Sequence, residues 1–559
     1  MKKIIRCSIF LFTLINAQFS FAQYTHDDTL RGSNGPERSW WDVLYYEIAI
    51  NPNFENKTIE GSVNILFKTK SDGDKIMQID LHEPLTIDKI TFENSKVDFK
   101  KSGTNTWSVF LKDIQPKIYM DKIDGRNGWI DKELSLVIYY HGKPDVALNP
   151  PWNGGLVWKR DDRNRPWMSI ACQSLGASVW YPCKDYQGDE PDNGVSLSTT
   201  VANILNVIAN GRLTSTIKNN DGTTTYKWEV KNPINNYDII PYIGNYVNFN
   251  EVYKGEGGNL EMNYWVLDYN LEKAKAQFTQ APKMMKAFEY WFGPYPFYED
   301  GYKLVEAPYL GMENQSDIAY GNHYQNGYFG SGDLSSTGWG MKWDYMIVHE
   351  SAHEWFGNSI TSIDIADMWI HESFADYAET LFTEFYFGKK AASEYVIGLR
   401  KRIENDIPII GPYGVNKEGS TDMYYKGANM LHTIRQIIND DEKFRMILRG
   451  LNKIFYHKTV TSKQVEEYIS KNSGIDLSKI FDEYLRTTKI PTLEYKIAGY
   501  NLSYRWTNVV KGFNMPLKIN FKCLQWIKPT EQWKTLSMYP EGKINFYIDD
   551  NFYIKTEKL

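Results

Sequence analysis

His349 and His353 lie four residues apart in the segment His349-Glu350-Ser351-Ala352-His353. On a helix this spacing puts both imidazoles on one face, about one turn apart, where both can bind one zinc ion. Glu350 can reach a water on that ion without binding the metal itself. Zinc lowers the pKa of such a water toward neutrality, and a carboxylate can accept its proton. The segment predicts a zinc hydrolase, although a chain with nine histidines can also match this pattern by chance.

A site with two histidines needs a third protein ligand, and Glu372 is the candidate. It follows His353 after eighteen intervening residues, on the next expected helix, 369–387. That helix can fold back antiparallel to the first and present one carboxylate to the metal. Two imidazoles, one carboxylate and one water would complete a catalytic zinc site with an open position. Spacing alone leaves open the alternative that Glu372 is a solvated helix residue.

The elements that must position these residues divide the chain into three parts. Residues 38–250 are mostly strand-like, and in 59–67 apolar and polar residues alternate with a period near two. Helical patterns follow, and strand patterns return past Pro491 for about 70 residues. We therefore expect an α+β multidomain protein with a β-domain over 23–250, a mainly helical catalytic domain over 251–490 and a small β-sandwich over 491–559. The expected helices include 271–292, 343–357, 369–387, 427–438 and 476–485.

The first 22 residues have the composition of a secretory signal. A basic start precedes an apolar run over residues 4–15, and Ser20-Phe21-Ala22 carries small residues at both positions that a signal peptidase reads. A short buried segment is the alternative. We therefore expect export, to a periplasmic, cell-surface or secreted location, with a mature chain that begins near Gln23.

Charge and cysteine content exclude several classes of protein. The net charge is only -6 and no long basic block occurs, so we expect no nucleic-acid partner. Past the signal no apolar run approaches the roughly 20 residues of a membrane span. Cys172, Cys183 and Cys523 are too few for a disulfide-built scaffold and lack metal-ligand spacing. Cys172 and Cys183 could pair with each other, and any metal should use histidine and carboxylate.

Several segments together resemble the zinc metallopeptidases that include aminopeptidase N and leukotriene hydrolase. The spacing from His349 to Glu372 matches that family, as do Trp355-Phe356-Gly357-Asn358 and Gly311-Met312-Glu313-Asn314. The family usually has a glycine where this chain has Leu310. The resemblance implies a thermolysin-like helical domain and one zinc ion held by His349, His353 and Glu372.

The resemblance also implies a role for each residue that matches a family motif. Glu313 corresponds to the glutamate that binds the free amino group of a peptide, with Gly311 and Met312 beside it in the substrate site. Gln173 matches a second residue of that amine pocket, where many relatives carry glutamate and leukotriene hydrolase carries glutamine. Tyr424, in Tyr424-Tyr425-Lys426-Gly427, matches the tyrosine that stabilises the oxyanion of the transition state.

The most consistent interpretation is a zinc aminopeptidase that acts on peptides with a free amino terminus. Glu350 would accept the proton of the attacking water. An endopeptidase or an epoxide hydrolase on the same scaffold is one alternative, and a non-catalytic surface-binding protein is another. Glu313 argues against an endopeptidase, because an anionic amine pocket has no use at internal bonds. The intact set of zinc ligands, Glu350 and Tyr424 argues against a non-catalytic protein.

Overall fold

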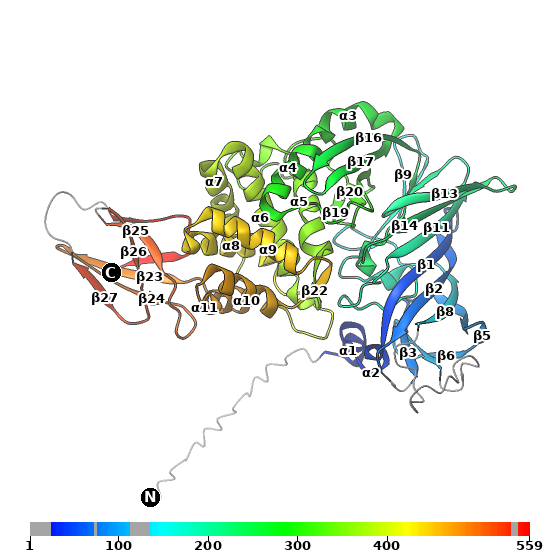
Figure 1. Cartoon of the computed structure of the whole chain (residues 1–559), viewed down its shortest axis with the longest axis horizontal. Helices are drawn as coiled ribbons and strands as arrows, with labels where there is room; N and C mark the ends of the chain where they lie inside the picture. Colours follow the sequence, from blue (N-terminus) through cyan, green and yellow to red (C-terminus); the bar gives the residue numbers. More distant parts are fainter. Residues whose placement is uncertain (1–23, 72–74, 112–132, 522, 538–545) are drawn as a thin grey trace, which may run out of the picture.

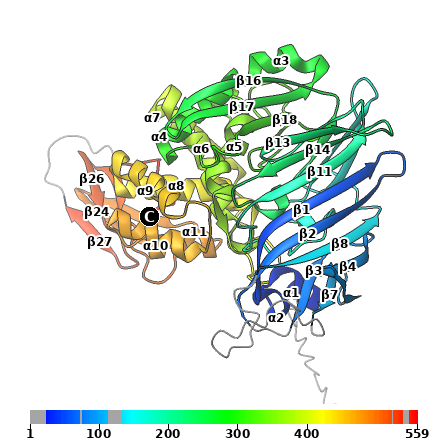
Figure 2. The same cartoon turned by 45° about the vertical axis from the view of Figure 1, so that its right-hand side comes forward.

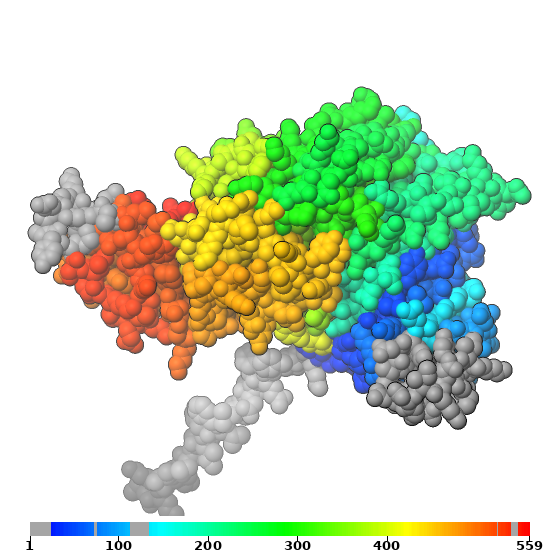
Figure 3. All heavy atoms as spheres, viewed as in Figure 1, coloured from blue at the N-terminus to red at the C-terminus, as the bar shows by residue number. Residues whose placement is uncertain are grey.

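A computed structural model describes residues 24–71, 75–111, 133–521, 523–537 and 546–559 (Figure 1). The expected signal over residues 1–22 lies outside the described residues. Strands gather at one end of the elongated molecule, helices occupy the middle, and a smaller group of strands forms the other end (Figures 1 and 2). In the space-filling view the three parts are in direct contact along the long axis (Figure 3).

The N-terminal domain is built from strands, as the alternating sequence predicted. Two short helices, α1 (His26–Gly32) and α2 (Pro36–Ser39), precede it. Its largest sheet has eight strands in the order β13 (Arg212–Lys218), β14 (Thr223–Val230), β11 (Val195–Ala202), β1 (Trp41–Asn53), β2 (Thr58–Thr69), β8 (Glu133–Gly142), β4 (Thr86–Phe92) and β5 (Ser95–Lys96). On β2 the apolar residues Ile59, Val63, Ile65 and Phe67 are buried. The alternation of apolar and polar residues therefore places the apolar side chains on the face of the sheet that packs into the core.

Two smaller sheets complete this domain. One has four strands in the order β12 (Asn206–Ile208), β15 (Tyr242–Gly244), β10 (Pro166–Ala171) and β9 (Gly155–Arg160). The other has three in the order β3 (Ile76–Asp80), β7 (Thr106–Phe110) and β6 (Asp98–Lys101). Cys172 and Cys183 are both buried here and both unpaired, so they do not form the disulfide that the sequence left open. The Cys172 thiol instead donates to the Tyr237 carbonyl oxygen at 3.3 Å.

The helical domain begins with its own five-stranded sheet. Its order is β16 (Tyr246–Gly255), β17 (Gly258–Leu267), β18 (Tyr302–Glu306), β20 (Ile318–Tyr320) and β19 (Gly311–Met312). The change from the N-terminal sheets therefore falls between Gly244 and Tyr246. The expected boundary at residue 250 divides β16, because a strand pattern does not reveal which sheet the strand joins. The short strand β19 is the last in the order and lies at the edge of the sheet.

The helices pack around α6 (Trp369–Phe387), which is buried from Trp369 through Thr383. Its neighbours include α4 (Ala281–Phe292), α5 (Tyr345–Ala352), α7 (Lys389–Leu399) and α8 (Tyr425–Ile438). The outer helices are α3 (Leu271–Gln277), α9 (Asp441–Ile454), α10 (Ser462–Ser473) and α11 (Ser478–Arg486), beside the strand pair β21 (Ile360–Ser362) and β22 (Lys458–Val460). The helix expected over 271–292 is two helices, because Pro282 has no backbone N–H and is suited to the first turn of a new helix, α4.

The C-terminal strands form two small sheets. The first has the order β27 (Lys534–Ser537), β24 (Asn501–Thr507), β23 (Thr492–Ala498) and β29 (Lys555–Lys558), and the second has the order β26 (Cys523–Ile527), β25 (Leu517–Phe521) and β28 (Phe546–Ile548). Buried residues of both sheets, such as Trp506 and Phe521, continue the apolar core of the helical domain. The C-terminal β-region is therefore packed directly on the helices. No helix among the described residues is long and apolar enough to cross a membrane.

Candidate metal centre and active site

Helix α5 presents the two histidines of the predicted metal site. Asp344 caps its first turn by accepting hydrogen bonds from the backbone N–H groups of Met346 and Ile347 at 3.1 and 3.4 Å. His349 lies on α5 and His353 directly follows it with helical backbone angles, and both are buried. The two imidazoles therefore stand one turn apart on the same face, as the spacing predicted.

The helix ends earlier than residue 357. After His353 the chain forms an irregular turn, η6 (Glu354–Asn358), in which Phe356 and Gly357 leave helical geometry. Gly357 has a φ of 135°, a conformation that other residues rarely adopt, and a Cβ there would lie 3.2 Å from His353 Nδ1. This turn directs the Phe356 carbonyl oxygen toward His353, whose Nδ1 donates to it at 3.1 Å.

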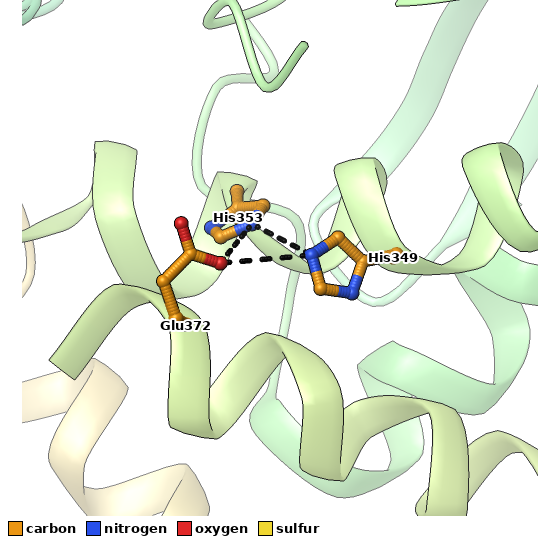
Figure 4. A group of neighbouring side chains, drawn as sticks. All are labelled: His349, His353 and Glu372. Atoms are coloured by element: carbon orange, nitrogen blue, oxygen red, sulfur yellow. Dashed lines mark hydrogen bonds and ion pairs between the residues drawn. The ribbon is translucent and has the colours of Figure 1, made fainter. Parts of the chain in front are cut away.

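His349, His353 and Glu372 form a nearly equilateral triangle of ligand atoms (Figure 4). The two Nε2 atoms are 3.4 Å apart, and Glu372 Oε2 lies 3.6 Å from His349 Nε2 and 3.5 Å from His353 Nε2. Tetrahedral ligands about 2.0–2.1 Å from a zinc ion are about 3.4 Å from one another. Glu372 Oε2 is buried and has no hydrogen-bond partner among the described residues. The residues therefore fit a tetrahedral zinc ion with a fourth, open position.

The remaining nitrogen of each histidine is also occupied. His349 Nδ1 donates to Glu379 Oε1 at 2.6 Å, while His353 uses the Phe356 carbonyl described above. Glu379 is itself fixed by the Tyr395 hydroxyl, which donates to its second oxygen at 2.6 Å. These bonds hold both rings with Nε2 toward the triangle. Glu379 was not among the predicted site residues, although it lies seven residues after Glu372 on the same face of α6, a spacing that could have revealed it.

Glu350 and Gly311 meet beside the triangle. Single ligand atoms of Glu350, Glu313 and His353 all lie within 4.8 Å of one another. A Cβ at Gly311, on the edge strand β19, would lie 2.7 Å from Glu350 Oε1 and would also collide with the sulfur of Met346. The absence of a side chain at Gly311 therefore leaves the space that the Glu350 carboxylate occupies. Met312 follows on the same strand and also lines the cavity described below.

Glu313 is buried at the junction of the two large domains. The Gln173 side-chain amide donates to Glu313 Oε1, and the Tyr237 hydroxyl lies 3.4 Å from the same oxygen. The backbone carbonyl of Glu313 accepts a hydrogen bond from Asn358 at 2.9 Å. Gln173 and Tyr237 belong to the N-terminal domain, so residues far apart in the sequence meet at this carboxylate. The structure thus brings the predicted pair Glu313 and Gln173 into direct contact.

Tyr424 lies at the start of α8, beside His349. The two rings are stacked with centroids 6.2 Å apart. Helix α8 approaches α6 closely because Gly427 has no side chain: a Cβ there would lie 2.7 Å from Ser373 Cβ and would collide with its hydroxyl. This close approach brings Tyr424 to the metal triangle, where burial and the nearby Glu372 carboxylate raise the pKa of its phenol.

Two family models cover most of the chain. The model of the peptidase M1 N-terminal domain matches residues 43–237, and the model of the peptidase family M1 domain matches residues 276–484. The chain belongs to peptidase family M1. It is therefore a hydrolase of a metallopeptidase family. The combination of an N-terminal β-rich domain and a helical catalytic domain is the architecture that these two models describe.

This M1 peptidase has distant curated relatives. Leukotriene A-4 hydrolase of Xenopus laevis is 20% identical over 455 residues, which cover 78% of this chain and 68% of that protein. Leucyl aminopeptidase of Saccharolobus solfataricus is 21% identical over 419 residues, or 71% of this chain and 52% of that protein. The chain thus spans between half and about two thirds of the length of these relatives.

Solved structures show the same fold. The M1 zinc metallopeptidase of Deinococcus radiodurans matches with a TM-score of 0.67 at 18% identity, over 81% of this chain and 95% of that chain. A mutant of the same enzyme bound to a Tyr-Ser-Ala substrate matches with a TM-score of 0.66 at 17% identity, over 81% of this chain and 96% of that chain.

In this M1 peptidase one cavity of about 710 Å³ contains the whole group of predicted residues. The metal triangle lies on its wall with Glu350, Tyr424, Glu313 and Gln173. Both the N-terminal and the helical domain contribute to the lining. The cavity also takes in residues that the sequence did not single out: Pro151, Trp152, Tyr328, Lys401, Arg402, Ile403, Glu404 and Glu418.

Burial and mutual repulsion shift the acidic groups of this cavity. The pKa of Glu350 is raised to about 7 by burial, with His349 lowering it and Glu372 raising it. The pKa of Glu313 is also raised, first by burial and then by Glu372 and Glu350. Burial lowers the pKa of His353 to about 4, which favours the neutral imidazole that binds metals. Glu372 and Glu379 raise the pKa of His349 despite its burial, so the site attracts positive charge.

Proposed function

We propose that this protein is a zinc-dependent aminopeptidase that removes residues from the free amino end of peptides. The observation that carries the proposal is the buried Glu313 carboxylate next to the triangle of His349, His353 and Glu372. A carboxylate in this position favours an ammonium group close to the metal. Only the first peptide bond of a substrate has a free amino group beside it, so this arrangement selects that bond.

Recognition of the amine would rest on Glu313 and Gln173 together. Gln173 donates one amide hydrogen to Glu313, which orients the carboxylate, and the amide oxygen of Gln173 is left to accept from an ammonium group. Charge-assisted hydrogen bonds of this kind are roughly twice as strong as neutral ones. Binding of a cation also offsets the burial that raises the pKa of Glu313. The backbone of Gly311 and Met312, on the edge strand, would lie along the substrate.

The reaction needs a polarised carbonyl, a nucleophilic water and a stabilised oxyanion. A bound zinc ion would supply Lewis acidity toward the carbonyl and would lower the pKa of a water. Glu350, with a pKa near 7, is suited to take the proton of the attacking water and to deliver it to the leaving amine. The Tyr424 phenol keeps its proton, because burial raises its pKa, and would donate it in a hydrogen bond to the oxyanion.

The same proposal includes export of the protein. It is supported by the basic start, the apolar run over residues 4–15 and the small residues at Ser20 and Ala22. N-terminal sequencing of the processed protein would test this step directly. A mature chain that begins near Gln23 is the expected result, and retention of residues 1–22 would contradict it.

A substitution of Glu350 by Gln tests the proposed chemistry. The amide has the shape of the carboxylate but cannot accept the proton, so kcat for an aminoacyl-anilide should fall by about 10²–10⁴-fold. The zinc content should stay at one ion per chain, because Glu350 is not part of the triangle. Full activity of this variant would contradict the mechanism.

Blocked substrates test the selectivity for amino ends. Acetylation of the substrate removes the positive charge that Glu313 binds, so cleavage of the acetylated peptide should be lost. Persistent cleavage would instead favour an endopeptidase. Dialysis against a chelator, followed by recovery of activity with zinc, tests the dependence on the metal. A chelated protein that retains full activity would refute the zinc-dependent reaction.

A further inference from the structure

Two basic residues line a cavity whose other charged residues are acidic. Lys401 and Arg402 lie on η8 (Arg400–Arg402), a short 3-10 turn that directly follows α7. Around them the cavity wall contains only carboxylates as charged groups besides the two histidines, namely Glu313, Glu350, Glu372, Glu404 and Glu418. Neither Lys401 nor Arg402 forms an ion pair with any residue that the structure describes. The two positive charges are therefore available to a ligand.

The position of Arg402 follows from a series of ring contacts that starts at the metal triangle. The Tyr424 ring lies 6.2 Å from His349, and the Tyr425 ring lies 6.3 Å from Tyr424. The Arg402 guanidinium lies 6.0 Å from the centre of Tyr425. Glu313, by contrast, lies next to His353. The cavity thus contains both the carboxylate proposed to bind the amine and the Arg402 guanidinium, which is three ring contacts away from His349.

Tyr328 lines the same cavity as Arg402 and Glu350. The pKa of Tyr328 is raised to about 12, mainly by burial and then by Glu350, while the charge of Arg402 lowers it. The Tyr328 ring is 5.0 Å from that of Tyr345, which stacks on His349 at 5.0 Å. A second row of rings thus extends from the metal triangle along the cavity wall that also contains Arg402.

The turn that carries the two basic residues is held firmly. Arg402 Nε donates to the Leu334 carbonyl oxygen at 2.9 Å, and none of the residues that the structure describes accepts a hydrogen bond from its terminal amino groups. Arg400, at the start of the turn, donates to Asn429 at 2.7 Å and to the Asp550 carbonyl oxygen at 2.8 Å. The helical domain and the C-terminal β-region therefore both fix the turn. A site fixed in this way loses little conformational entropy when it binds a ligand.

We propose that Lys401 and Arg402 form a carboxylate-binding subsite for the part of the peptide that leaves, so that the enzyme prefers short peptides with a free carboxyl end. This inference rests on the proposed aminopeptidase function. Each extended residue spans at most about 3.3–3.6 Å, so in a short peptide with its amine at Glu313 the terminal carboxylate lies only a few residues beyond the metal. A cavity that contains both the buried Glu313 carboxylate and two basic residues without ion pairs among the described residues complements such a zwitterion.

Three peptides with the same first two residues test the subsite. The first is a tripeptide with a free carboxyl end, the second is its C-terminal amide, and the third is an amide with glutamate as its third residue. For the wild-type enzyme, kcat/KM should be about tenfold or more higher for the acid than for the amide. A preference for the glutamate amide over the plain amide would show that a side-chain carboxylate can also occupy the subsite.

Variants then assign the preference to the two basic residues. R402A and the double variant K401A/R402A should bring the acid-to-amide ratio close to one, whereas R402K should retain part of it. K390A is the matched control, because Lys390 is 90% exposed on the preceding helix and does not line the cavity. It should keep the wild-type ratio. Because the ratio is taken within each variant, a loss of folded enzyme affects both substrates equally and cancels.

An aminoacyl-anilide separates failure of this inference from failure of the proposed function. If the wild-type enzyme cleaves the anilide but cleaves the acid and the amide equally well, the subsite is refuted and the aminopeptidase function stands. An acid-to-amide ratio that survives in K401A/R402A also refutes the assignment. If the wild-type enzyme cleaves neither the anilide nor any peptide, the proposed function fails and the inference fails with it.

Discussion

Substitution of Glu379 by Gln should weaken zinc binding without removing a single metal ligand. Glu379 is completely buried and accepts the hydrogen bond of His349 Nδ1 at 2.6 Å. Its negative charge makes His349 a stronger donor of electrons to a metal and fixes the ring with Nε2 toward Glu372. An amide oxygen can still accept from His349, so the geometry is kept while the charge is lost.

The expected size of the effect follows from this exchange. A hydrogen bond to a charged acceptor contributes about 1.5–3 kcal/mol, against about 1 kcal/mol for a neutral one. The substitution should therefore cost about 1–2 kcal/mol, which raises the zinc dissociation constant by about 5–30-fold. The Tyr395 hydroxyl, 2.6 Å from the other oxygen of Glu379, can still contact an amide, so gross unfolding is not expected.

Competition between the apoenzyme and a chelator of known affinity measures this constant at fixed pH. Glu354→Gln is the matched control, because Glu354 is also buried and lies next to His353 but contacts Ser316 and Tyr295 instead. Burial raises the pKa of Glu354 to about 8, so its side chain is already mostly uncharged at neutral pH. A zinc constant that stays within twofold of wild type in E379Q, or that weakens equally in E354Q, would refute the reasoning.

Three further predictions concern the cavity and the N-terminal domain. Gly311→Ala places a Cβ 2.7 Å from Glu350 Oε1 and should lower kcat/KM by about tenfold or more with zinc content unchanged; normal kinetics would contradict this contact. Gln173→Ala removes a donor to Glu313 and should raise KM for an aminoacyl-anilide by about tenfold, and an unchanged KM would contradict this role. Burial raises the pKa of Glu190 to about 8 from 4.5, so its contribution to stability is complete below pH 4.5 and is lost as the pH rises through 8. Gln at position 190 cannot lose a proton, so the melting temperature of the wild type should fall relative to that of Glu190→Gln as the pH rises from 5.5 to 8.5. Melting temperatures that change with pH in parallel in the two proteins would contradict the raised pKa of Glu190.

The helices that carry the metal ligands could be predicted because their signals are local. The helix over Trp369–Phe387 was expected at the same residues, and Gly388 directly follows its last residue. The end of α5 was harder to predict. Trp355 and Phe356 continue the apolar pattern, but the backbone turns at Gly357 to direct a carbonyl toward His353. The periodicity of apolar residues does not reveal that a helix ends early so that a backbone carbonyl can accept a hydrogen bond from a histidine.

The boundaries between the three parts of the chain were harder to predict, because they depend on contacts between residues that are far apart in the sequence. Strand β16 has a strand-like sequence like those before it, yet it pairs with β17 in the sheet of the helical domain. Which partner a strand selects is decided by contacts with residues far along the chain. The same holds for Cys172 and Cys183, whose separation in the sequence allowed a disulfide that the fold does not form.

The two halves of the site differ in the same way. The metal half comes from one helix, the turn after it and the next helix, so the spacing paired His349 with His353 and made Glu372 a candidate, which the family resemblance then supported. The substrate half joins two domains: Gln173 reaches Glu313 across a separation of 140 residues, and Gly311 leaves space for Glu350. In the proposed aminopeptidase, selection of amino ends would therefore depend on how the N-terminal domain packs against the helical domain. A change at that junction can alter which bond is cut while the metal triangle stays intact.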